Sequence, residues 1–160
     1  MDAAEEALAH CQITSLLSLY YQALDVGDLE TLGREVMSED ATWEMIQRAG
    51  EDRVEDRVSG RSEVLAWFEG MLSSGVSMTE GTVRHFLNTH VIRIAPDGGS
   101  ARSTSHLQAV DTGTMAILAV GFAEGEHVRT AEGWRIRRYR IEERITAKDM
   151  AVFKAGAAPG

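Results

Sequence analysis

Residues 83–110 read VRHFLNTHVIRIAPDGGSARSTSHLQAV, and this segment predicts two antiparallel strands joined by a tight turn. The dipeptide Asp97-Gly98 is a strong hairpin signal, because both residue types tolerate the positive φ angles that two-residue turns require. A turn at this point places Thr89 opposite His106. The segment holds three of the five histidines in the chain, so this register determines the face on which each of them lies.

The two faces of the hairpin follow from this register, because side chains on a strand alternate between faces and paired residues share one. His85 and His106 fall on the same face, whereas His90 falls on the other. The two histidines are separated by about 13 Å along the ladder at about 3.3 Å per residue, so they would flank a ligand unless a bulge or curvature shortens that distance. The expected ligand-facing set is His85, Leu87, Thr89, Val91, Thr104, His106, Gln108 and Val110.

Length and composition favour one globular domain over residues 1–154, followed by a loose tail over residues 155–160. The chain has 160 residues and a net charge of −9, which disfavours a nucleic-acid partner because such binding requires a basic surface. The acidic N-terminus does not resemble a signal peptide, and no apolar run approaches the ~20 residues that span a membrane. We therefore expect a cytoplasmic protein without a membrane or nucleic-acid partner.

The single cysteine, Cys11, excludes an internal disulfide and a cysteine-rich metal site. It falls on the apolar side of a helical pattern, so we expect a buried, inert thiol.

Helical periodicity is clearest over residues 3–25, and Gly27 is placed to end this helix. Asp28 is a suitable N-cap for a short second helix, and Ser62 for a third. Residues 41–46 indicate a strand, whereas the polar segment 48–60 is interpreted as a solvated loop, with a flap over a pocket as the alternative. The expected apolar stripes of the three helices are Ile13, Leu16, Leu17, Tyr20 and Leu24; Leu29, Leu32 and Val36; and Val64, Leu65, Phe68, Met71 and Leu72.

The rest of the chain predicts strands and turns. A long strand is expected over residues 114–129, and a last one over 134–145, where the apolar residues change parity as they do at a β-bulge. The fold class is therefore α+β: a cone-like, curved antiparallel sheet (an α+β barrel) wrapped around a long N-terminal helix, with about three helices. The open end of such a cone is a natural small-molecule pocket.

Three small residues, Ala119, Gly121 and Ala123, are expected on the face shared with His106. They indicate either an empty cavity or a helix packed close to the sheet, and the sequence favours neither. The opposite face is more apolar than a solvated face should be, which predicts a homodimer or homotrimer formed through it. The residues of this outer face are Phe86, Ile92, Leu118, Val120 and Phe122.

Asp25 lies at the C-terminal end of the first predicted helix, where a negative charge is disfavoured. This position has two alternative explanations: Asp25 serves a functional site, or it forms an Asx-type turn that leads into Gly27. Tyr20 and Tyr21 precede it by about one helical turn and can present a hydroxyl toward the same space. An aspartate, histidines and a tyrosine can remove a proton beside a carbonyl and return it to a departing hydroxide, which is the chemistry of dehydration, double-bond migration or ring closure.

Other chemistries are less favoured. The sequence contains no G-x-S-x-G elbow, no phosphate-binding glycine loop and no dinucleotide fingerprint. Metal binding by His85 and His106 would need Asp25 or Glu44 as a third ligand, so we expect no metal and no cofactor. The arginine-rich segment 135–144 is interpreted as a solvated or dimer face, from which one arginine could reach an anionic substrate.

The order of these elements resembles the nuclear transport factor 2-like superfamily, in its SnoaL-like branch, over about residues 8–146. Within that branch the chain looks most like scytalone dehydratase and the bacterial bile-acid dehydratases. The resemblance rests on three motifs: ALDVGD at 23–28, RHFL at 84–87 and SHLQ at 105–108. The chain departs from scytalone dehydratase at Leu24, where that family has a tyrosine, and at Trp43, near which no strand tyrosine occurs.

The resemblance implies a cofactor-independent dehydratase, a lyase acting on a small hydroxylated carbonyl or polyketide-like substrate. His85 would be the principal acid–base, Asp25 would orient or charge a histidine, His106 would be a second proton carrier or substrate anchor, and Tyr20 would donate to the carbonyl. The alternatives are an isomerase or polyketide cyclase with Asp25 as base, and a noncatalytic domain that binds a ligand or another subunit. The expected substrate-binding residues are Tyr21, Trp43, Leu87, Thr89, Gln108, Ala119, Gly121 and Tyr139.

Overall fold

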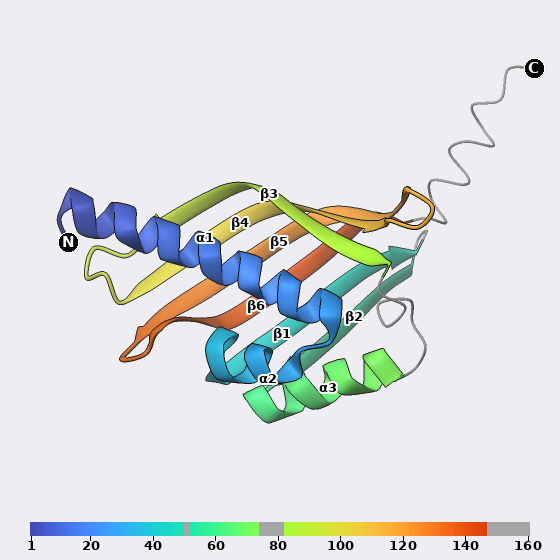
Figure 1. Cartoon of the computed structure of the whole chain (residues 1–160), viewed down its shortest axis with the longest axis horizontal. Helices are drawn as coiled ribbons and strands as arrows, with labels where there is room; N and C mark the ends of the chain where they lie inside the picture. Colours follow the sequence, from blue (N-terminus) through green and yellow to red (C-terminus); the bar gives the residue numbers. More distant parts are fainter. Residues whose placement is uncertain (50–51, 74–81, 147–160) are drawn as a thin grey trace, which may run out of the picture.

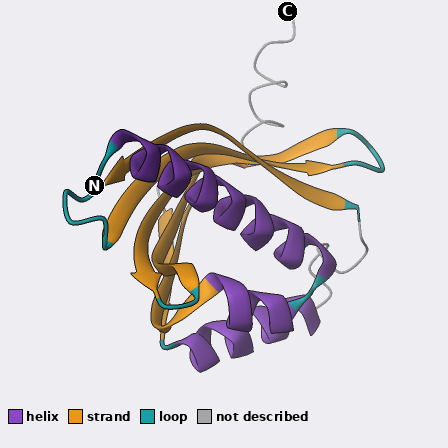
Figure 2. Ribbon diagram, turned by 60° about the vertical axis from the view of Figure 1, so that its left-hand side comes forward, coloured by secondary structure: helices purple, strands orange, loops and turns teal. Residues whose placement is uncertain are grey.

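The computed structural model describes residues 1–49, 52–73 and 82–146, and it shows a curved sheet with helices on its concave side (Figures 1 and 2). The described helices are α1 (Ala3–Val26), α2 (Leu29–Thr31), the π-helical turn η1 (Leu32–Val36) and α3 (Arg61–Ser73). The strands are β1 (Met37–Ala49), β2 (Asp52–Ser59), β3 (Val83–Ile94), β4 (Ser100–Asp111), β5 (Ala116–Thr130) and β6 (Gly133–Thr146). The predicted tail, 155–160, lies outside the described residues.

Helix α1 lies across the concave face of the sheet and is the long N-terminal helix that the periodicity predicts (Figure 1). Asp2 and Glu5 form a capping box at its start, which satisfies backbone donors of the first turn. Gly27, with φ 72°, ends the helix in the left-handed conformation that glycine adopts without strain. The whole predicted apolar stripe of α1 is buried in the core.

The short helices follow directly from α1. The carboxylate of Asp28 accepts a hydrogen bond from the backbone N–H of Thr31 at 3.0 Å, as predicted for an N-cap. The third helix contradicts its predicted cap, because α3 already begins at Arg61 and Ser62 lies inside its first turn. Its predicted apolar stripe is buried in part: Val64 and Phe68 are fully buried, whereas Leu65 and Met71 pack against the core partly buried.

The sheet has the strand order β2-β1-β6-β5-β4-β3 and is open, because its edges β2 and β3 do not pair with each other. Four of its five ladders are antiparallel, as expected, whereas β1 runs parallel to β6. The open sheet curves around α1, which contacts β3 and β6, while α3 packs on β1 and β2, so the α+β cone architecture is confirmed.

The charged segment 48–60 was expected to be a loop, and this prediction is wrong. Strand β1 continues to Ala49, and β2 returns beside it as an antiparallel edge strand. Charged side chains are well suited to an edge strand, because they remain hydrated and discourage pairing with other chains. One of them, Arg57, lies 3.5 Å from the buried Glu44 carboxylate of β1.

A bulge in β3 changes the predicted register of the central hairpin. Val91 pairs with Thr104 as expected, but on the other side of the bulge His106 pairs with Asn88 rather than Thr89. Thr89 occupies the bulge with φ 53°, a conformation that is uncommon for a residue other than glycine. The extra residue reverses the alternation of side chains along β3. Before the bulge His85 and Leu87 face the interior, and after it His90 and Ile92 do.

The other predicted bulge, in β6, is confirmed. Trp134 and Ile136 are buried on one side of the register shift, and Tyr139 and Ile141, of the other parity, are buried beyond it. A second shift in the β5–β6 ladder lies beside Gly121, where a Cβ atom would overlap the Glu142 carbonyl. Glycine is therefore required for this close approach of two strands.

Three further residues differ from their predicted surroundings. The thiol of Cys11 is exposed rather than buried, because the apolar stripe of α1 passes on the other side of the helix. The β3 bulge turns Ile92 away from the outer face and packs it against the core. In its place Val91, expected on the ligand face, is 46% exposed.

Candidate active site

Asp25 and His85 are in direct contact at the end of α1 and the beginning of β3. The Asp25 Oδ1 atom lies 2.6 Å from the His85 Nδ1 atom, and the second carboxylate oxygen accepts the backbone N–H of His85 at 3.1 Å. Both side chains are largely buried, at 8% and 12% exposed respectively. The backbone bond fixes the carboxylate, so the imidazole is held in one orientation.

This contact defines the proton positions on the ring. A carboxylate oxygen accepts, so Nδ1 carries a hydrogen, and in the neutral ring Nε2 then presents its lone pair. Within the described residues no hydrogen bond to Nε2 is found, and the ring remains partly exposed. An imidazole with this tautomer can accept a proton at Nε2, and the carboxylate then stabilises the resulting cation.

Tyr21 forms the wall beside this pair. Its ring lies 5.2 Å from the His85 ring with an interplanar angle of 31°, and its hydroxyl accepts a hydrogen bond from the Tyr139 hydroxyl at 3.1 Å. Burial raises the pKa of both tyrosines well above the usual value, so both phenols are neutral. Tyr21 therefore packs on the imidazole as a neutral, immobilised ring.

The small residues of β5 do lie on the interior face, but they accompany His85 and not His106. His85 pairs with Ala109, which pairs in turn with Ala119. Leu87 lies in the next row, which contains Gly121 on β5. Ala109, Ala119 and Gly121 therefore form a surface of small residues, here called the small-residue floor, which begins beside His85 and extends across the sheet toward β6.

The structure separates the second predicted histidine from the first. His106 is exposed on the outer face, where its ring packs against Phe122 at 5.1 Å, so the prediction that it shares the face of His85 is wrong. The cause is the β3 bulge, which shifts every pairing before it by one residue. For the same reason Thr89 and Gln108 do not face the interior, and neither do Thr104 and Val110.

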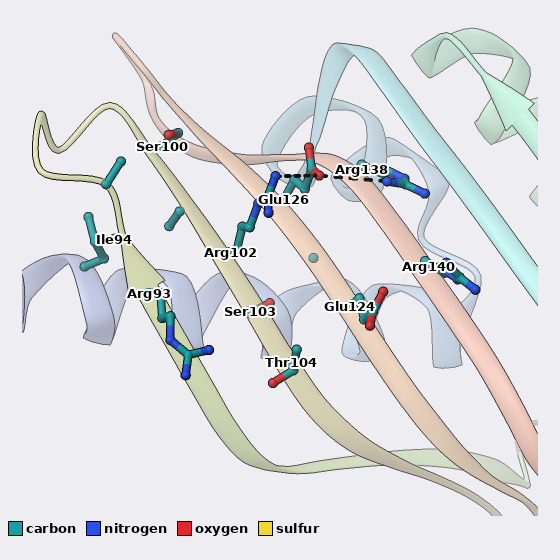
Figure 3. Close-up of a pocket in the computed structure, with 13 residues that line it drawn as sticks. Arg93, Ile94, Ser100, Arg102, Ser103, Thr104, Glu124, Glu126, Arg138 and Arg140 are labelled. Carbon is teal, nitrogen blue, oxygen red and sulfur yellow. Dashed lines mark ion pairs between the residues drawn. The ribbon is translucent and has the colours of Figure 1, made fainter.

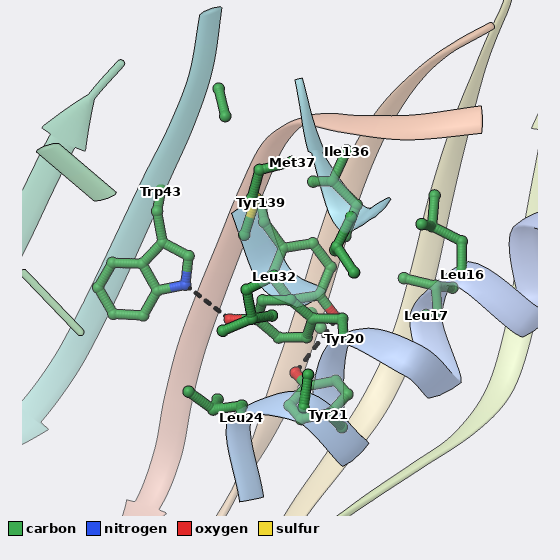
Figure 4. Packing of buried hydrophobic residues seen from close by; sticks show 14 of the residues in the cluster. Leu16, Leu17, Tyr20, Tyr21, Leu24, Leu32, Met37, Trp43, Ile136 and Tyr139 are labelled. Atoms are coloured by element: carbon green, nitrogen blue, oxygen red, sulfur yellow. Dashed lines mark hydrogen bonds between the residues drawn. The ribbon is translucent and has the colours of Figure 1, made fainter. Parts of the chain in front are cut away.

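Tyr20 and Trp43 also differ from their expected roles. The Tyr20 side chain is completely buried, and its hydroxyl accepts a hydrogen bond from Trp43 Nε1 at 2.9 Å (Figure 4). Desolvation raises the pKa of Tyr20 well above its usual value. This hydroxyl is therefore occupied within the core and is not available to a substrate carbonyl.

Two polar residues of the interior were missed by the sequence reasoning. The carboxylate of Glu143 on β6 accepts a hydrogen bond from Gln47 Nε2 on β1 at 3.1 Å. Burial raises the pKa of Glu143, an effect that the Gln47 bond and the charge of His85 partly offset. The one signal available in the sequence was that Glu143 continues the inward parity of Tyr139 and Ile141.

Two separate histidine–serine hydrogen bonds lie on the interior face of the sheet, beyond the bulge, and connect β3 with β4 and β4 with β5. His90 Nδ1 is 2.8 Å from Ser105 Oγ, and His127 Nε2 is 2.8 Å from Ser103 Oγ. His127 is 1% exposed, and its Nδ1 has no hydrogen-bond partner. Desolvation lowers the pKa of His127 to about 4, and it also lowers the pKa of His90.

One hollow lined by described residues lies beside Asp25, and another lies on the outer face of the sheet. A pocket of about 450 Å³ opens beside Asp25 between α1, α2 and Arg84. A hollow of about 660 Å³ lies on the outer face, among charged side chains such as Arg102, Glu126 and Arg138, and does not include Asp25 or His85 (Figure 3). Within the described part of the chain no three histidine, cysteine, aspartate or glutamate side chains are grouped so that they could hold a metal ion.

A comparison with protein families matches the SnoaL-like domain over residues 5–140, and the chain belongs to this family of the NTF2-like superfamily. No curated protein matches the sequence. None of the helices in the described ranges is both long and apolar enough to cross a membrane.

Solved structures share the fold. An NTF2-like protein with a cystatin-like fold from Novosphingobium aromaticivorans is 24% identical, with a TM-score of 0.71 and coverage of 94% of this chain and 93% of that one. A protein from the same organism, provisionally named a scytalone dehydratase, is 18% identical, with a TM-score of 0.68 and 91% of both chains covered. A provisionally named NTF2-like dehydratase from Streptomyces avermitilis is 17% identical, with a TM-score of 0.63 and coverage of 84% and 95%. At these identities the likeness establishes the fold alone.

Proposed function

We propose that this protein is a cofactor-independent dehydratase in which the Asp25–His85 pair removes a proton beside the carbonyl of a small hydroxylated substrate. The observation that carries the proposal is the 2.6 Å contact between the Asp25 carboxylate and His85 Nδ1. It leaves Nε2 as the basic nitrogen on an interior face floored by small side chains. Relatives of the same fold that are provisionally named dehydratases support this reaction class.

His85 is the base in this proposal, and Asp25 orients it. When Nε2 takes the proton from the carbon beside the carbonyl, the nearby carboxylate stabilises the imidazolium that forms, and such general-base catalysis contributes about 10²–10⁴-fold. Tyr21 keeps the ring in place by packing on one side. His106 and Tyr20 have no part in the proposal, because one is on the outer face and the other is inside the core.

The proposal is tested with a panel of cyclic and acyclic β-hydroxy ketones, by following the absorbance of the conjugated enone that elimination of water forms. His85→Asn is expected to lower kcat by about 100-fold or more, and Asp25→Asn by a similar factor. The matched control is His106→Asn, which should remain within about twofold of the wild type because that residue faces outward.

Other outcomes separate the alternative functions. An isomerase or cyclase with Asp25 as base would lose activity in Asp25→Asn but retain much of it in His85→Asn, and it would release no water from an isomerisation substrate. A noncatalytic binding domain would bind members of the panel without converting any of them. Either result would contradict the dehydratase assignment.

A further inference from the structure

Glu143 lies on the interior face of β6, on the opposite side of the small-residue floor from His85. Its row of the sheet runs from Leu87 on β3 through Leu107 and Gly121 to Glu143 itself. Three strand spacings separate β3 from β6, about 14 Å between backbones along a flat sheet, and the curvature of the cone shortens this distance. His85 is close enough for its charge to influence the pKa of Glu143.

The two neighbouring glutamates of β6 have contrasting surroundings. Glu142 forms ion pairs with Arg140 and Arg144, at 3.8 and 2.9 Å. Glu143 turns inward, where its described hydrogen-bond partner is the uncharged amide of Gln47. Among the described residues no arginine or lysine forms an ion pair with it.

This environment disfavours the charged form of Glu143 relative to that of an exposed glutamate. Burial disfavours the carboxylate and raises the pKa of Glu143, while a neutral amide compensates a negative charge less than a cation does. The titratable group that faces it from β3 is His85, and β5 contributes only Gly121 at this row. The Gln47 amide donates to Oε2, so Oε1 remains as the oxygen that can carry and release a proton.

We propose that Glu143 is the general acid that protonates the departing hydroxyl group, opposite the Asp25–His85 base. The assignment rests on the proposed dehydratase function and adds the residue that this function lacks. His85 Nε2 takes the proton from the α-carbon, and that electron pair forms the carbon–carbon double bond. The bond from the β-carbon to oxygen breaks, its electron pair stays on oxygen, and the proton of Glu143 completes the water molecule. The imidazolium and the carboxylate then return to their starting states by proton exchange with solvent.

The substrate that fits this arrangement is a β-hydroxy carbonyl compound. Its acidic C–H bond and its hydroxyl group are on neighbouring carbons, so the side chains of His85 and Glu143 must converge from β3 and β6 on these two atoms above Ala109, Ala119 and Gly121. Larger side chains at these three positions would occupy the space that the substrate needs.

The first test concerns the protonation of Glu143 and needs no substrate. In protein labelled with ¹³C at glutamate carboxyls, the Glu143 signal is assigned from Glu143→Gln and its titration is followed by NMR. We expect a pKa above the ordinary value of 4.5, because burial raises it. A pKa for Glu143 at or below 4.5 would overturn the assignment.

The second test separates proton removal from loss of the hydroxyl group. Each variant is given a β-hydroxy ketone, for elimination, and the matching ketone without the hydroxyl, for exchange of the α-proton in deuterium oxide. Glu143→Gln should lower elimination by about 100-fold and leave exchange within about threefold, whereas His85→Asn should lower both. Glu142→Gln is the matched control and should change neither rate.

The possible failures are distinguishable. Wild-type protein that catalyses neither reaction would overturn the proposed function, and the role of Glu143 with it. Active wild-type protein with elimination unchanged in Glu143→Gln would overturn only the role of Glu143. Equal losses of both rates in Glu143→Gln, with an unchanged melting temperature, would instead place Glu143 at the carbonyl oxygen and contradict its action on the leaving group.

Discussion

His127 is a histidine that the fold holds in its neutral form. The side chain is 1% exposed, one ring nitrogen is bonded to Ser103, and the other has no partner among the described residues. Desolvation lowers its pKa from 6.5 to about 4. Protonation of the folded protein is therefore disfavoured between these two pH values, whereas the unfolded chain takes up the proton freely.

This difference predicts a loss of stability in mild acid. The stabilisation is complete above pH 6.5, because neither state is then protonated, and it decreases as the pH falls toward 4. Between pH 7 and pH 5 the wild-type protein should lose about 2 kcal/mol more unfolding free energy than His127→Gln. Urea unfolding at a series of pH values measures the difference.

His106→Gln is the matched control, because it makes the same substitution at an exposed histidine. Parallel curves for wild-type protein and His127→Gln would show that the buried ring does not cause the acid sensitivity.

At the scale of single elements, the bulge in β3 has the largest consequence for the site. Thr89 adopts φ 53° there, and a β-branched residue in this region is strained by about 1–3 kcal/mol. The bulge turns His90 and Ile92 inward and leaves His85 on the interior face before it. The strained bulge at Thr89 thus determines which face of the sheet His85, His90 and His106 occupy relative to one another.

Relief of this strain gives a testable expectation. Asparagine tolerates positive φ better than threonine, so Thr89→Asn should raise the free energy of unfolding by about 1 kcal/mol without changing activity. Thr104→Asn, at an exposed position of β4 without positive φ, is the matched control and should give no gain. If both variants behave alike in urea unfolding, the bulge is not strained as described.

At the scale of the whole molecule, the outer face of β3, β4 and β5 has the features of a surface that pairs with a second copy of the chain. Phe86 and Phe122 are 50% and 42% exposed. Charges of both signs lie beside Phe122, including Glu124, Arg140 and Arg144, so two copies can place opposite charges against each other. We propose a homodimer or homotrimer formed through this face.

Light scattering after gel filtration tests this assembly. The wild-type mass should be two or three times 17.5 kDa, and Phe122→Asp should shift it toward the monomer because a charge would be buried without a partner. Met115→Asp is the matched control, since this residue is 76% exposed at the turn between β4 and β5. A wild-type mass of 17.5 kDa would exclude the assembly under those conditions.

The helical part of the fold and one half of the site could be predicted from local patterns. The stripe of α1 repeats with the helical period, and Gly27 marks its end, so the position of Asp25 at that terminus followed directly. His85 could be placed on the interior face for the same reason, because alternation along one strand needs no information from elsewhere.

The bulge in β3 was harder to detect, although its pattern is present. Leu87 and Ile92 have opposite parity and both face the interior, as at the β6 bulge, but the exposed Phe86 and Val91 are equally apolar and conceal the change. A strand sequence contains no further local signal for a bulge, because pairing with β4 determines which residue is extra. His106 was consequently assigned to the wrong face.

The remaining features depend on contacts between distant segments. The charged edge strand β2 forms because β1 offers it a partner, and Gln47 meets Glu143 because β1 and β6 run in parallel. The α+β class, the long helix and the position of Asp25 at its end thus follow from local periodicity and turn chemistry, whereas the contact of Asp25 with His85 joins α1 to β3. The register, the faces of His90 and His106 and the position of Glu143 follow from strand pairing, which couples residues far apart in the chain.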